Sequence, residues 1–371
     1  MSHQSRVAGR GLSRRDFLES ASSALSASSA LSALSALSAC RPKDGGPPAS
    51  GSGPLERELA IYNWSDYIGE TTIADFERET GVRVTYDTYE SNEDLIAKLQ
   101  AGATGYDIVV PSGYAVRVLR ALDLIQPIDR SALTGQWANL DPRFLGTPVD
   151  PDNQFTVPWQ WGSAGLAVRT DLVKESLDSW GVFQDPGLRG KMTQLDDMRD
   201  VIGAWLKFRG HSLNSIITAE LEQARADAIQ AKPNLKSYVS APVKAQLIAG
   251  DVWVAHLWNG DTAQARAANP AIEFVLPKEG SMIYLDSLCI PRGARSPRAA
   301  HAFMNFVLRA DQAASISRRT GYGSPNAAAL AADASLLGPP TPQEMTRLEY
   351  QDDLGAATTE WDRVWTEIKS A

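Results

Sequence analysis

Acidic and aromatic side chains stand close together at several points of this sequence. Residues 64–67 read Trp-Ser-Asp-Tyr, which combines two rings, a hydroxyl and a carboxylate. Tyr284 and Asp286 are two residues apart, so they share one face if this segment is a strand. Carboxylates bind cations through charge-assisted hydrogen bonds, and ring faces attract cations. A pair of carboxylates among aromatic rings also suits a glycoside hydrolase, so both kinds of chemistry remain open at this point.

Other candidates have a plain structural alternative. Asp197 and Asp200 begin a predicted helix, where the helix dipole stabilises acids in any case. Ser112 precedes another predicted helix and Asp261 follows a predicted strand, so each could simply cap a helix. In the loop of residues 64–67, the tryptophan could fill the core and the aspartate could cap the next turn. Residue type alone therefore does not separate binding from structural roles.

The hydrophobic pattern predicts strands and helices in alternation from residue 59 onward. Alternating or continuous apolar runs predict strands, and amphipathic runs that end at glycine predict helices. This order is typical of an α/β fold, in which ligands bind at the carboxyl ends of strands. The predicted strands are residues 59–63, 82–89, 106–110, 165–169, 251–257 and 283–291, and the predicted helices are residues 71–80, 92–101, 197–208 and 296–308.

The composition is that of a globular protein with an acidic balance. The chain has 371 residues, 43% of them hydrophobic, and a formal net charge of −8. This length suggests two domains, and the lack of a basic stretch argues against nucleic acid as a partner. Cys289 and His256 lie in apolar runs and are predicted to be core residues. Since His211, His256 and His301 are scattered, we expect no metal site and no cofactor.

The N-terminal residues predict an export signal. Arg14 and Arg15, followed by a serine-rich and weakly apolar run, resemble a twin-arginine signal. The sequence Leu-Ser-Ala before Cys40 resembles a lipoprotein processing site; cleavage at Ala39 with an incidental cysteine is the alternative. We therefore expect a signal peptide at residues 1–39, a lipid on Cys40 and a flexible linker at residues 40–58.

Several short segments carry a family resemblance when they are taken together. In chain order they are IYNWSDY (61–67), YESN (89–92), DIVVPS (107–112), NLDP (139–142), WNG (258–260), PKEG (277–280), DSL (286–288) and GYGSPN (321–326). Each segment alone is a weak signal. The ordered set, behind an export signal, closely resembles the periplasmic spermidine/putrescine-binding proteins of polyamine ABC importers, from about residue 59 to the C-terminus.

The resemblance implies a type II periplasmic-binding-protein fold, with two α/β lobes and the ligand in the cleft between them. Lobe 1 is expected at residues 59–162 and 286–332, and lobe 2 at residues 163–285 and 333–371. The resemblance also implies ligand-binding roles for a set of acidic, aromatic and polar residues: Trp64, Ser65, Asp66, Tyr67, Ser112, Tyr114, Asp197, Asp200, Ser240, Trp258, Asp261, Tyr284, Asp286, Tyr322 and Gln351.

The implied function is capture of putrescine or spermidine in the periplasm and its delivery to the permease of an ABC importer. We expect a lipid-anchored monomer with no enzymatic activity. Two positions depart from the family pattern: Asp200 is one methylene shorter than the common glutamate, and Tyr284 stands where Trp or Phe is usual. Asp261 resembles putrescine-preferring members and Gln351 spermidine-preferring ones, so the preferred polyamine stays open.

Three other functions compete with this interpretation. A glycoside hydrolase needs a carboxylate pair in fixed geometry, and no segment of the sequence fixes one. The same fold could bind iron, an anion or a sugar, but iron needs adjacent tyrosines or histidines, and an anion needs arginines where this sequence has acids. A polyamine sensor that serves no transporter is not separated from a transport protein by sequence.

Overall fold

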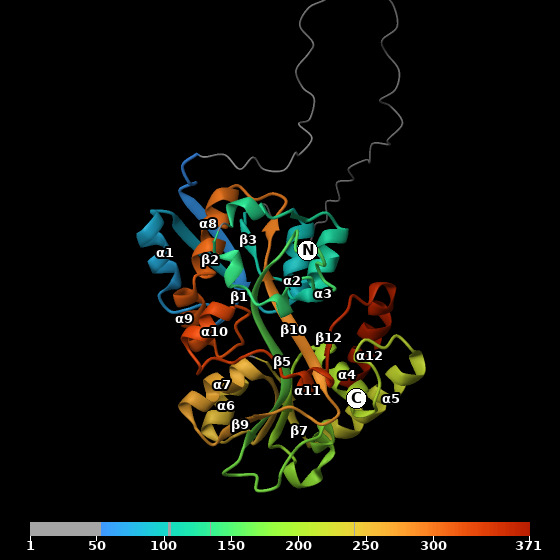
Figure 1. Ribbon diagram of the computed structural model, residues 1–371. Helices are drawn as coiled ribbons and strands as arrows, with labels where there is room; N and C mark the ends of the chain where they lie inside the picture. The colour runs from blue at the N-terminus through green and yellow to red at the C-terminus, as the bar shows by residue number, and fades with distance from the viewer. Residues whose placement is uncertain (1–52, 103–104, 134, 241) are drawn as a thin grey trace, which may run out of the picture. The chain divides into compact units, whose positions relative to one another are not determined.

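The computed structural model describes residues 53–102, 105–133, 135–240 and 242–371 (Figure 1). The predicted signal peptide, Cys40 and the linker up to residue 52 lie outside the described residues. All the described residues belong to one compact unit. Within them, no helix is both long enough and apolar enough to cross a membrane.

The first sheet is parallel, with the strand order β2-β1-β3. Its strands are β1 (Glu58–Trp64), β2 (Arg83–Tyr89) and β3 (Ile108–Val109), and the helices between and after them are α1 (Thr72–Thr80), α2 (Asn92–Gln100) and α3 (Gly113–Ala121). Ser91 caps α2 by accepting a hydrogen bond from the backbone of Asp94, so the sequence signal for this helix start is confirmed. Because the strands are parallel, the loops at their carboxyl ends meet at one edge of the sheet.

The second sheet has the order β12-β10-β5-β8-β6-β7, and β9 also pairs with β5. Its strands are β5 (Val157–Arg169), β6 (Met192–Gln194), β7 (Leu235–Tyr238), β8 (Val254–Trp258), β9 (Ile272–Val275), β10 (Ser281–Leu288) and β12 (Leu348–Tyr350). A short antiparallel pair joins β4 (Ile125–Gln126) to β11 (Ile290–Pro291). The second sheet is mixed, and its antiparallel pairs are those of β5 with β8, β9 and β10.

The antiparallel strands β5 and β10 lie side by side and connect the two halves of the fold (Figure 1). Residues 157–163 of β5 pair with β10, and residues 164–169 pair with β8 and β9. The sequence predicted a strand at residues 165–169 only. The strand begins eight residues earlier, at Val157. This early start was missed because all residues of the strand are buried, so its sequence lacks the alternation that marks a half-exposed strand.

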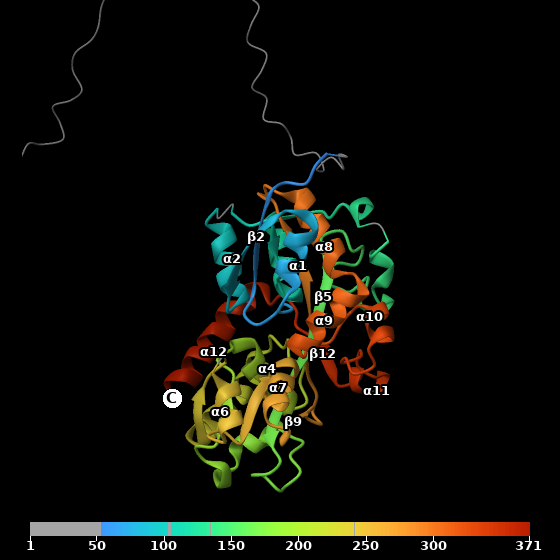
Figure 2. The same ribbon diagram turned by 90° about the vertical axis from the view of Figure 1, so that its left-hand side faces the viewer.

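The remaining helices cover the sheets on both halves (Figure 2). They are α4 (Met198–Phe208), α5 (Thr218–Ala231), α6 (Val243–Ala249), α7 (Asn259–Ala268), α8 (Pro297–Val307), α9 (Ala310–Thr320), α10 (Ala327–Ala332), α11 (Pro342–Met345) and α12 (Thr358–Ser370). Short 3-10 helices in the connections are η1 (Arg130–Ala132), η2 (Trp137–Asn139), η3 (Pro142–Phe144), η4 (Trp180–Gln184), η5 (Pro186–Leu188), η6 (Lys232–Asn234) and η7 (Gly355–Ala357).

Separate hydrophobic cores show that the fold has two lobes. One core packs Phe76 of α1 against Phe303 of α8, and it includes Ile61 of β1. Another core surrounds Trp205 of α4 and Trp361 of α12. The residue boundaries of the lobes given above stay a prediction.

The two residues predicted from the sequence to lie in the core are buried as expected. Cys289 is a free, buried thiol, and burial raises its pKa well above the usual value. His256 is buried against the ring of Trp180, with ring centroids 4.5 Å apart. Burial lowers the pKa of His256 to about 3, so this side chain is a neutral core residue.

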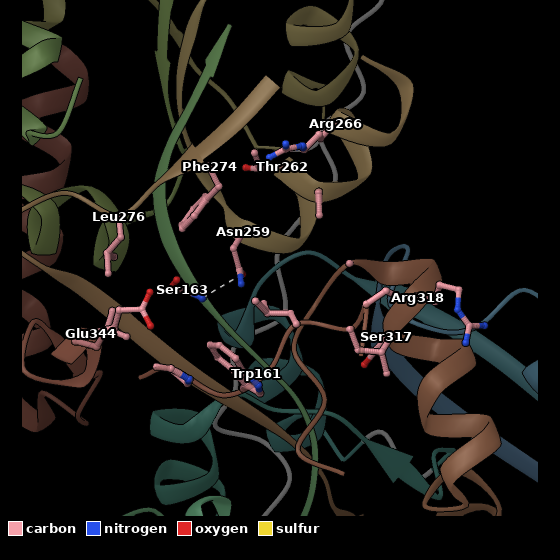
Figure 3. Close-up of a pocket in the computed structure, with 18 residues that line it drawn as sticks. Trp161, Ser163, Asn259, Thr262, Arg266, Phe274, Leu276, Ser317, Arg318 and Glu344 are labelled. Atoms are coloured by element: carbon pink, nitrogen blue, oxygen red, sulfur yellow. Dashed lines mark hydrogen bonds between the residues drawn. The ribbon is translucent and has the colours of Figure 1, made fainter. Parts of the chain in front are cut away.

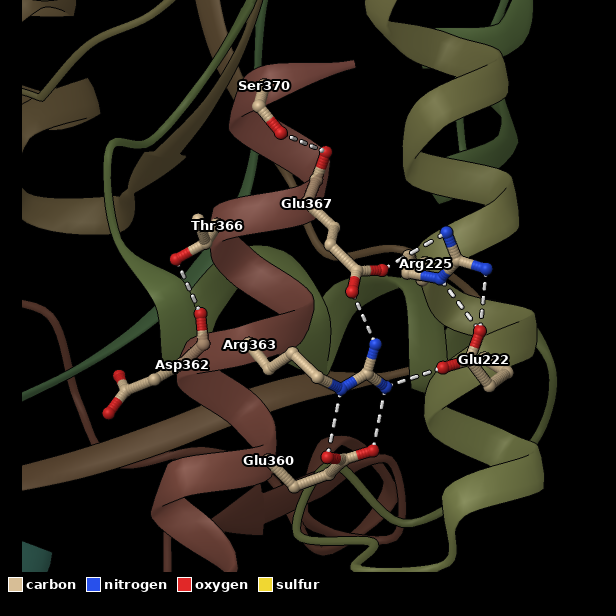
Figure 4. Close-up of polar contacts among 8 residues, drawn as sticks. All are labelled: Glu222, Arg225, Glu360, Asp362, Arg363, Thr366, Glu367 and Ser370. Atoms are coloured by element: carbon tan, nitrogen blue, oxygen red, sulfur yellow. Dashed lines mark hydrogen bonds and ion pairs between the residues drawn. The ribbon is translucent and has the colours of Figure 1, made fainter.

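Helix α12 returns the chain to the second lobe and packs against α4 and α5 (Figure 1). Trp361 of α12 is fully buried and donates its indole N–H to the carbonyl oxygen of Ser215, at 3.2 Å. On the outer surface, Arg363 of α12 forms ion pairs with Glu360 and with Glu222 of α5 (Figure 4). Exposed ion pairs contribute little to stability, so the buried face of this helix, with Trp361 as its largest side chain, is its main anchor.

Replacement of Trp361 by alanine is expected to lower the free energy of unfolding by about 3–5 kcal/mol, because it removes a large buried side chain and leaves a cavity. Thr366 is exposed on the same helix, so Thr366→Ala serves as a matched control and should change stability by less than about 0.5 kcal/mol. Urea denaturation followed by circular dichroism measures both values. Equal unfolding midpoints for the two variants would show that Trp361 does not anchor the helix.

Candidate functional site

A cavity of about 500 Å³ lies where strand-end loops of both sheets meet. Every residue predicted from the sequence to bind the ligand lines this cavity: Trp64, Ser65, Asp66, Tyr67, Ser112, Tyr114, Asp197, Asp200, Ser240, Trp258, Asp261, Tyr284, Asp286, Tyr322 and Gln351. They come from segments that are far apart in the sequence. The structure therefore brings the whole predicted set together, while ligand binding by each residue stays a prediction.

Aromatic rings form much of the wall of this cavity. Trp64 is fixed by a hydrogen bond from its indole N–H to the carbonyl oxygen of Val110, at 2.9 Å, and by the ring of Tyr89, 4.6 Å away. The rings of Tyr67 and Tyr322 meet edge to face, with centroids 5.0 Å apart. Since these rings are held by their neighbours, they offer preformed apolar faces.

Two glycines allow the rings to approach the backbone. A Cβ atom on Gly162 would lie 2.3 Å from the hydroxyl oxygen of Tyr284, which faces it across the β5–β10 ladder. A Cβ atom on Gly260 would lie 2.4 Å from the ring of Tyr322. No larger side chain fits at either position without displacing a ring from the cavity wall.

Asp286 is the most deeply buried carboxylate that lines the cavity. Its side chain is 4% exposed, and its Oδ1 atom has no hydrogen-bond partner within the described part of the chain. Burial raises the pKa of Asp286 from its usual 3.8 to about 7, although the nearby hydroxyls of Ser112 and Tyr67 oppose this increase. The Tyr67 hydroxyl does not complete a hydrogen bond in this geometry. The carboxylate thus has a free acceptor atom although the residue itself is almost fully buried.

Gln160 lies next to Asp286 on the neighbouring strand β5. It pairs directly with Asp286 across the β5–β10 ladder and is 1% exposed. Its side-chain amide donates to the carbonyl oxygen of Tyr67, at 3.3 Å, and its amide oxygen accepts from the hydroxyl of Thr320. One buried amide therefore links the loop after β1 to the C-terminal end of α9.

A second acidic pair lies at the start of α4. Asp197 caps this helix by accepting from the backbone N–H of Asp200, at 2.9 Å, and its side chain also lines the cavity. Asp200 accepts from the indole N–H of Trp258 at 2.9 Å and from the amide of Gln351 at 3.2 Å. Burial, and then the negative charge of Asp197, raise the pKa of Asp200 well above its usual value.

Tyr114 and Arg199 lie next to this acidic pair. The guanidinium carbon of Arg199 lies 5.2 Å from the centre of the Tyr114 ring and 5.1 Å from that of Trp361. The Tyr114 hydroxyl donates to Glu93 at 3.0 Å. The positive charge of Arg199 partly offsets the burial of Asp197 and Asp200.

A lysine stands at a third acidic position. The ammonium of Lys244 lies 3.2 Å from an oxygen of Asp66 and 3.1 Å from an oxygen of Asp261. The N-cap residue of α7 is Trp258, so the alternative in which Asp261 caps this helix is wrong. Ser112 precedes α3 but forms no side-chain capping bond, so its hydroxyl is free to face Asp286.

Sequence reasoning missed several residues that line the cavity: Glu90, Ser91, Asn92, Asp196, Tyr238, Val239, Lys244 and Met282. Asn92 is the most informative of them, because its amide oxygen accepts from the backbone N–H of Ser112 at 3.1 Å and its amide donates to Tyr114 at 3.2 Å. The segment of residues 89–92 carried part of the family resemblance, so a signal for Glu90, Ser91 and Asn92 was present. Lys244 had no comparable signal, because a lone lysine on a short helix is typical of a protein surface.

The charge of the cavity favours a cationic ligand. Among its described lining residues, Lys244 is the one lysine or arginine, whereas seven lining residues carry carboxyl groups: Asp66, Glu90, Asp196, Asp197, Asp200, Asp261 and Asp286. No group of three or more His, Cys, Asp and Glu side chains in the described residues is arranged to hold a metal ion. Buried acids with aromatic walls therefore suit an organic cation with apolar links between its charges.

A second cavity, of about 650 Å³, has the opposite character (Figure 3). It is lined by Trp161 and Ser163 of β5, by Arg266 and Arg318, and by one acid, Glu344. Arginines without a carboxylate cluster do not suit a cation, and this cavity contains none of the residues predicted from the sequence. The acidic cavity is therefore the candidate site.

Comparison with known proteins agrees with this choice. A family described as bacterial extracellular solute-binding protein matches residues 71–339. The spermidine/putrescine-binding periplasmic protein of Escherichia coli K12 is 36% identical over 321 residues, which cover 84% of this chain and 91% of that protein. The putrescine/cadaverine-binding protein of Pseudomonas aeruginosa is 33% identical over 332 residues, 84% of this chain and 93% of that protein.

Solved structures support the same relationship. The TpPotD lipoprotein of Treponema pallidum superimposes with a TM-score of 0.77 at 33% identity and covers 84% of this chain and 99% of its own. The spermidine/putrescine ABC transporter substrate-binding protein PotD of Streptococcus pneumoniae has a TM-score of 0.74 at 30% identity, with coverage of 85% and 99%. The resemblance stated from the sequence and the type II two-lobe fold are confirmed. This chain belongs to the family of bacterial extracellular solute-binding proteins.

Proposed function

We propose that this protein captures a polyamine in the cleft between its lobes and delivers it to an ABC importer. The observation that carries this proposal is the buried carboxylate of Asp286, with one oxygen unpaired among the described residues and aromatic rings around it. An ammonium group satisfies that oxygen and offsets the unfavourable burial of the negative charge. The ligand is therefore expected to bring positive charge to this point.

The acidic pair at the start of α4 offers a second place for a nitrogen. Asp200 is buried and its pKa is raised by burial and by Asp197, so a second ammonium there relieves repulsion between two like charges. Between the two acidic regions, Trp258 and Tyr284 line the cavity and are placed to cover the methylenes of the ligand. Each good contact between an ammonium and a ring face contributes on the order of 0.5–2 kcal/mol.

The relatives support both the ligand class and the partner. The E. coli relative is named for binding spermidine and putrescine, and the S. pneumoniae structure is named as the substrate-binding protein of an ABC transporter. By analogy we propose that the permease of an ABC importer receives the ligand from this chain. The remaining polar lining residues predicted from the sequence, Ser65, Ser240 and Gln351 among them, are proposed as further contacts.

The proposed location is the periplasmic side of the membrane. The relatives in E. coli and Shigella flexneri are named as periplasmic proteins, and the T. pallidum relative is named as a lipoprotein. From the sequence motifs alone we propose twin-arginine export of this chain and a lipid on Cys40. We also propose that the protein acts as a monomer and that it has no catalytic activity of its own.

Binding of putrescine and spermidine tests the proposal directly. Titration calorimetry should show saturable binding of at least one of them to the purified protein. Asp286→Asn keeps the size of the side chain but removes its charge, and it should weaken binding by about 2–5 kcal/mol.

The control for this variant is Asp178→Asn, which makes the same charge change at an exposed position in the second lobe. It should leave the affinity unchanged. Wild-type protein that binds neither putrescine, cadaverine, spermidine nor spermine would contradict the proposed function. Wild-type affinity in Asp286→Asn would remove Asp286 from the site.

The affinity should also depend on pH below about 7. The pKa of Asp286 is raised to about 7 in the folded protein, so this group is increasingly protonated as the pH falls from 7. Alkyl ammonium groups stay charged in this range, because their pKa is about 10. Binding a cation favours the ionised carboxylate and must release a proton, so affinity should rise with pH by up to about tenfold per unit below 7 and level off above it.

The same shift has the opposite effect on the stability of the unliganded protein. The folded state holds the proton of Asp286 more tightly than the unfolded state does, so the contribution of this group to stability decreases as the pH rises from about 4 to about 7. Calorimetry in buffers of different ionisation enthalpy measures the proton release on binding. Asp286→Asn should reduce that release at pH 6, and an unchanged release would assign the proton to another group, such as Asp200.

A further inference from the structure

The ammonium of Lys244 has its full set of acceptors inside the candidate site. It lies 3.2 Å from Asp66, 3.1 Å from Asp261 and 2.9 Å from the amide oxygen of Gln264. An ammonium group has three N–H donors, and each acceptor here takes one of them. The lysine therefore occupies the place that an ammonium group of a ligand would take at these two carboxylates.

Neighbouring contacts hold this arrangement in place. Gln264 is oriented by its own amide, which donates to the carbonyl oxygen of Thr320 at 2.7 Å. Asp66 has a left-handed backbone, with φ of 54°, in the loop that follows β1. Asp is one of the residue types that tolerate this conformation. The lysine thus joins an acid of the first lobe to an acid of the second lobe.

The charge of Lys244 is maintained in this environment. Burial alone would lower the pKa of Lys244, but Asp261 and Asp66 outweigh burial and raise it. Burial raises the pKa of Asp261, and Lys244 opposes that increase. The lysine and the two acids therefore form an ion-paired group at neutral pH, and their combined charge is less negative than that of the acids alone.

Apart from this ion-paired group and Glu90, whose charge acts on Asp261, two carboxylate regions of the cavity have no lysine. They are Asp286, with its unpaired oxygen, and the pair Asp197 and Asp200. A ligand with two ammonium groups can place one at each. A further ammonium group would have to approach Asp66 and Asp261, where Lys244 competes for the same oxygens and repels a like charge.

We propose that Lys244 is a specificity-determining residue, an ammonium group fixed within the chain that makes the site prefer diamines over triamines. This inference rests on the proposed function of the same cavity, and it names the substrate class within that function.

The test compares putrescine and spermidine on wild-type protein and on Lys244→Met, which removes the charge and keeps a side chain of similar length. Lys236→Met is the matched control, because Lys236 is exposed on β7 and does not line the cavity. Titration calorimetry gives the ratio of the two dissociation constants for each protein, and circular dichroism checks that each variant is folded.

We expect wild-type protein and Lys236→Met to bind putrescine more tightly than spermidine. In Lys244→Met the freed carboxylates should accept the additional ammonium, so spermidine should bind about tenfold more tightly than to wild type while putrescine changes by less than about threefold. Lys244→Arg keeps the charge and should retain the preference for putrescine. Lys244→Gln removes the charge, keeps a donor for Asp261 and should behave as Lys244→Met does, which provides a second variant if Lys244→Met fails to fold.

Two results would overturn the proposal while leaving the proposed function intact. One is a wild-type preference for spermidine. The other is an unchanged ratio of the dissociation constants in Lys244→Met and Lys244→Gln, including an equal loss of both ligands, which would make Lys244 a contact that holds the lobes together. A wild-type protein that binds neither ligand would instead overturn the proposed function, and the inference with it.

Discussion

The proposed capture of a cation by this protein depends on the unpaired, buried oxygen of Asp286. A carboxylate loses hydration when aromatic rings surround it, and the raised pKa of Asp286 reflects that loss. A protein can compensate with an internal cation or with hydrogen bonds, as it does for Asp261 through Lys244 and for Asp200 through Trp258. The hydroxyls near Asp286 compensate only in part, so an external cation has most to contribute there.

The fold explains how such a carboxylate is held at the junction of two lobes. Strands β5 and β10 cross from one lobe to the other as an antiparallel pair, and Asp286 lies on β10 opposite Gln160 on β5. The side chain of Gln160 in turn binds the backbone of Tyr67 and the hydroxyl of Thr320 at the end of α9, so one buried amide links two segments beside the acid. Movement of the lobes about this strand pair would change the distance between the first-lobe loops and the acids on α4 without displacing Asp286 from its strand.

Much of the site was predictable because its residue types are conspicuous where strands end. Tryptophans, tyrosines and aspartates in strand-end loops already suggest binding, and the ordered family segments supplied the rest. Gln160 was not predictable, since its role depends on the register of β5 with β10. The early start of β5 was hidden by its burial on both faces, which removes the alternating pattern. Lys244 was missed because its meaning comes from two acids that reach it from other segments, one of them on the other lobe.

A crystal structure of the protein with putrescine tests the central claim most directly. We expect one ammonium nitrogen of putrescine within hydrogen-bonding distance of Oδ1 of Asp286, the other nitrogen at Asp200, and the methylenes against the aromatic wall. A ligand bound in the second cavity beside Arg266 and Arg318, or one in the cleft that leaves Asp286 Oδ1 without a cationic partner, would contradict it.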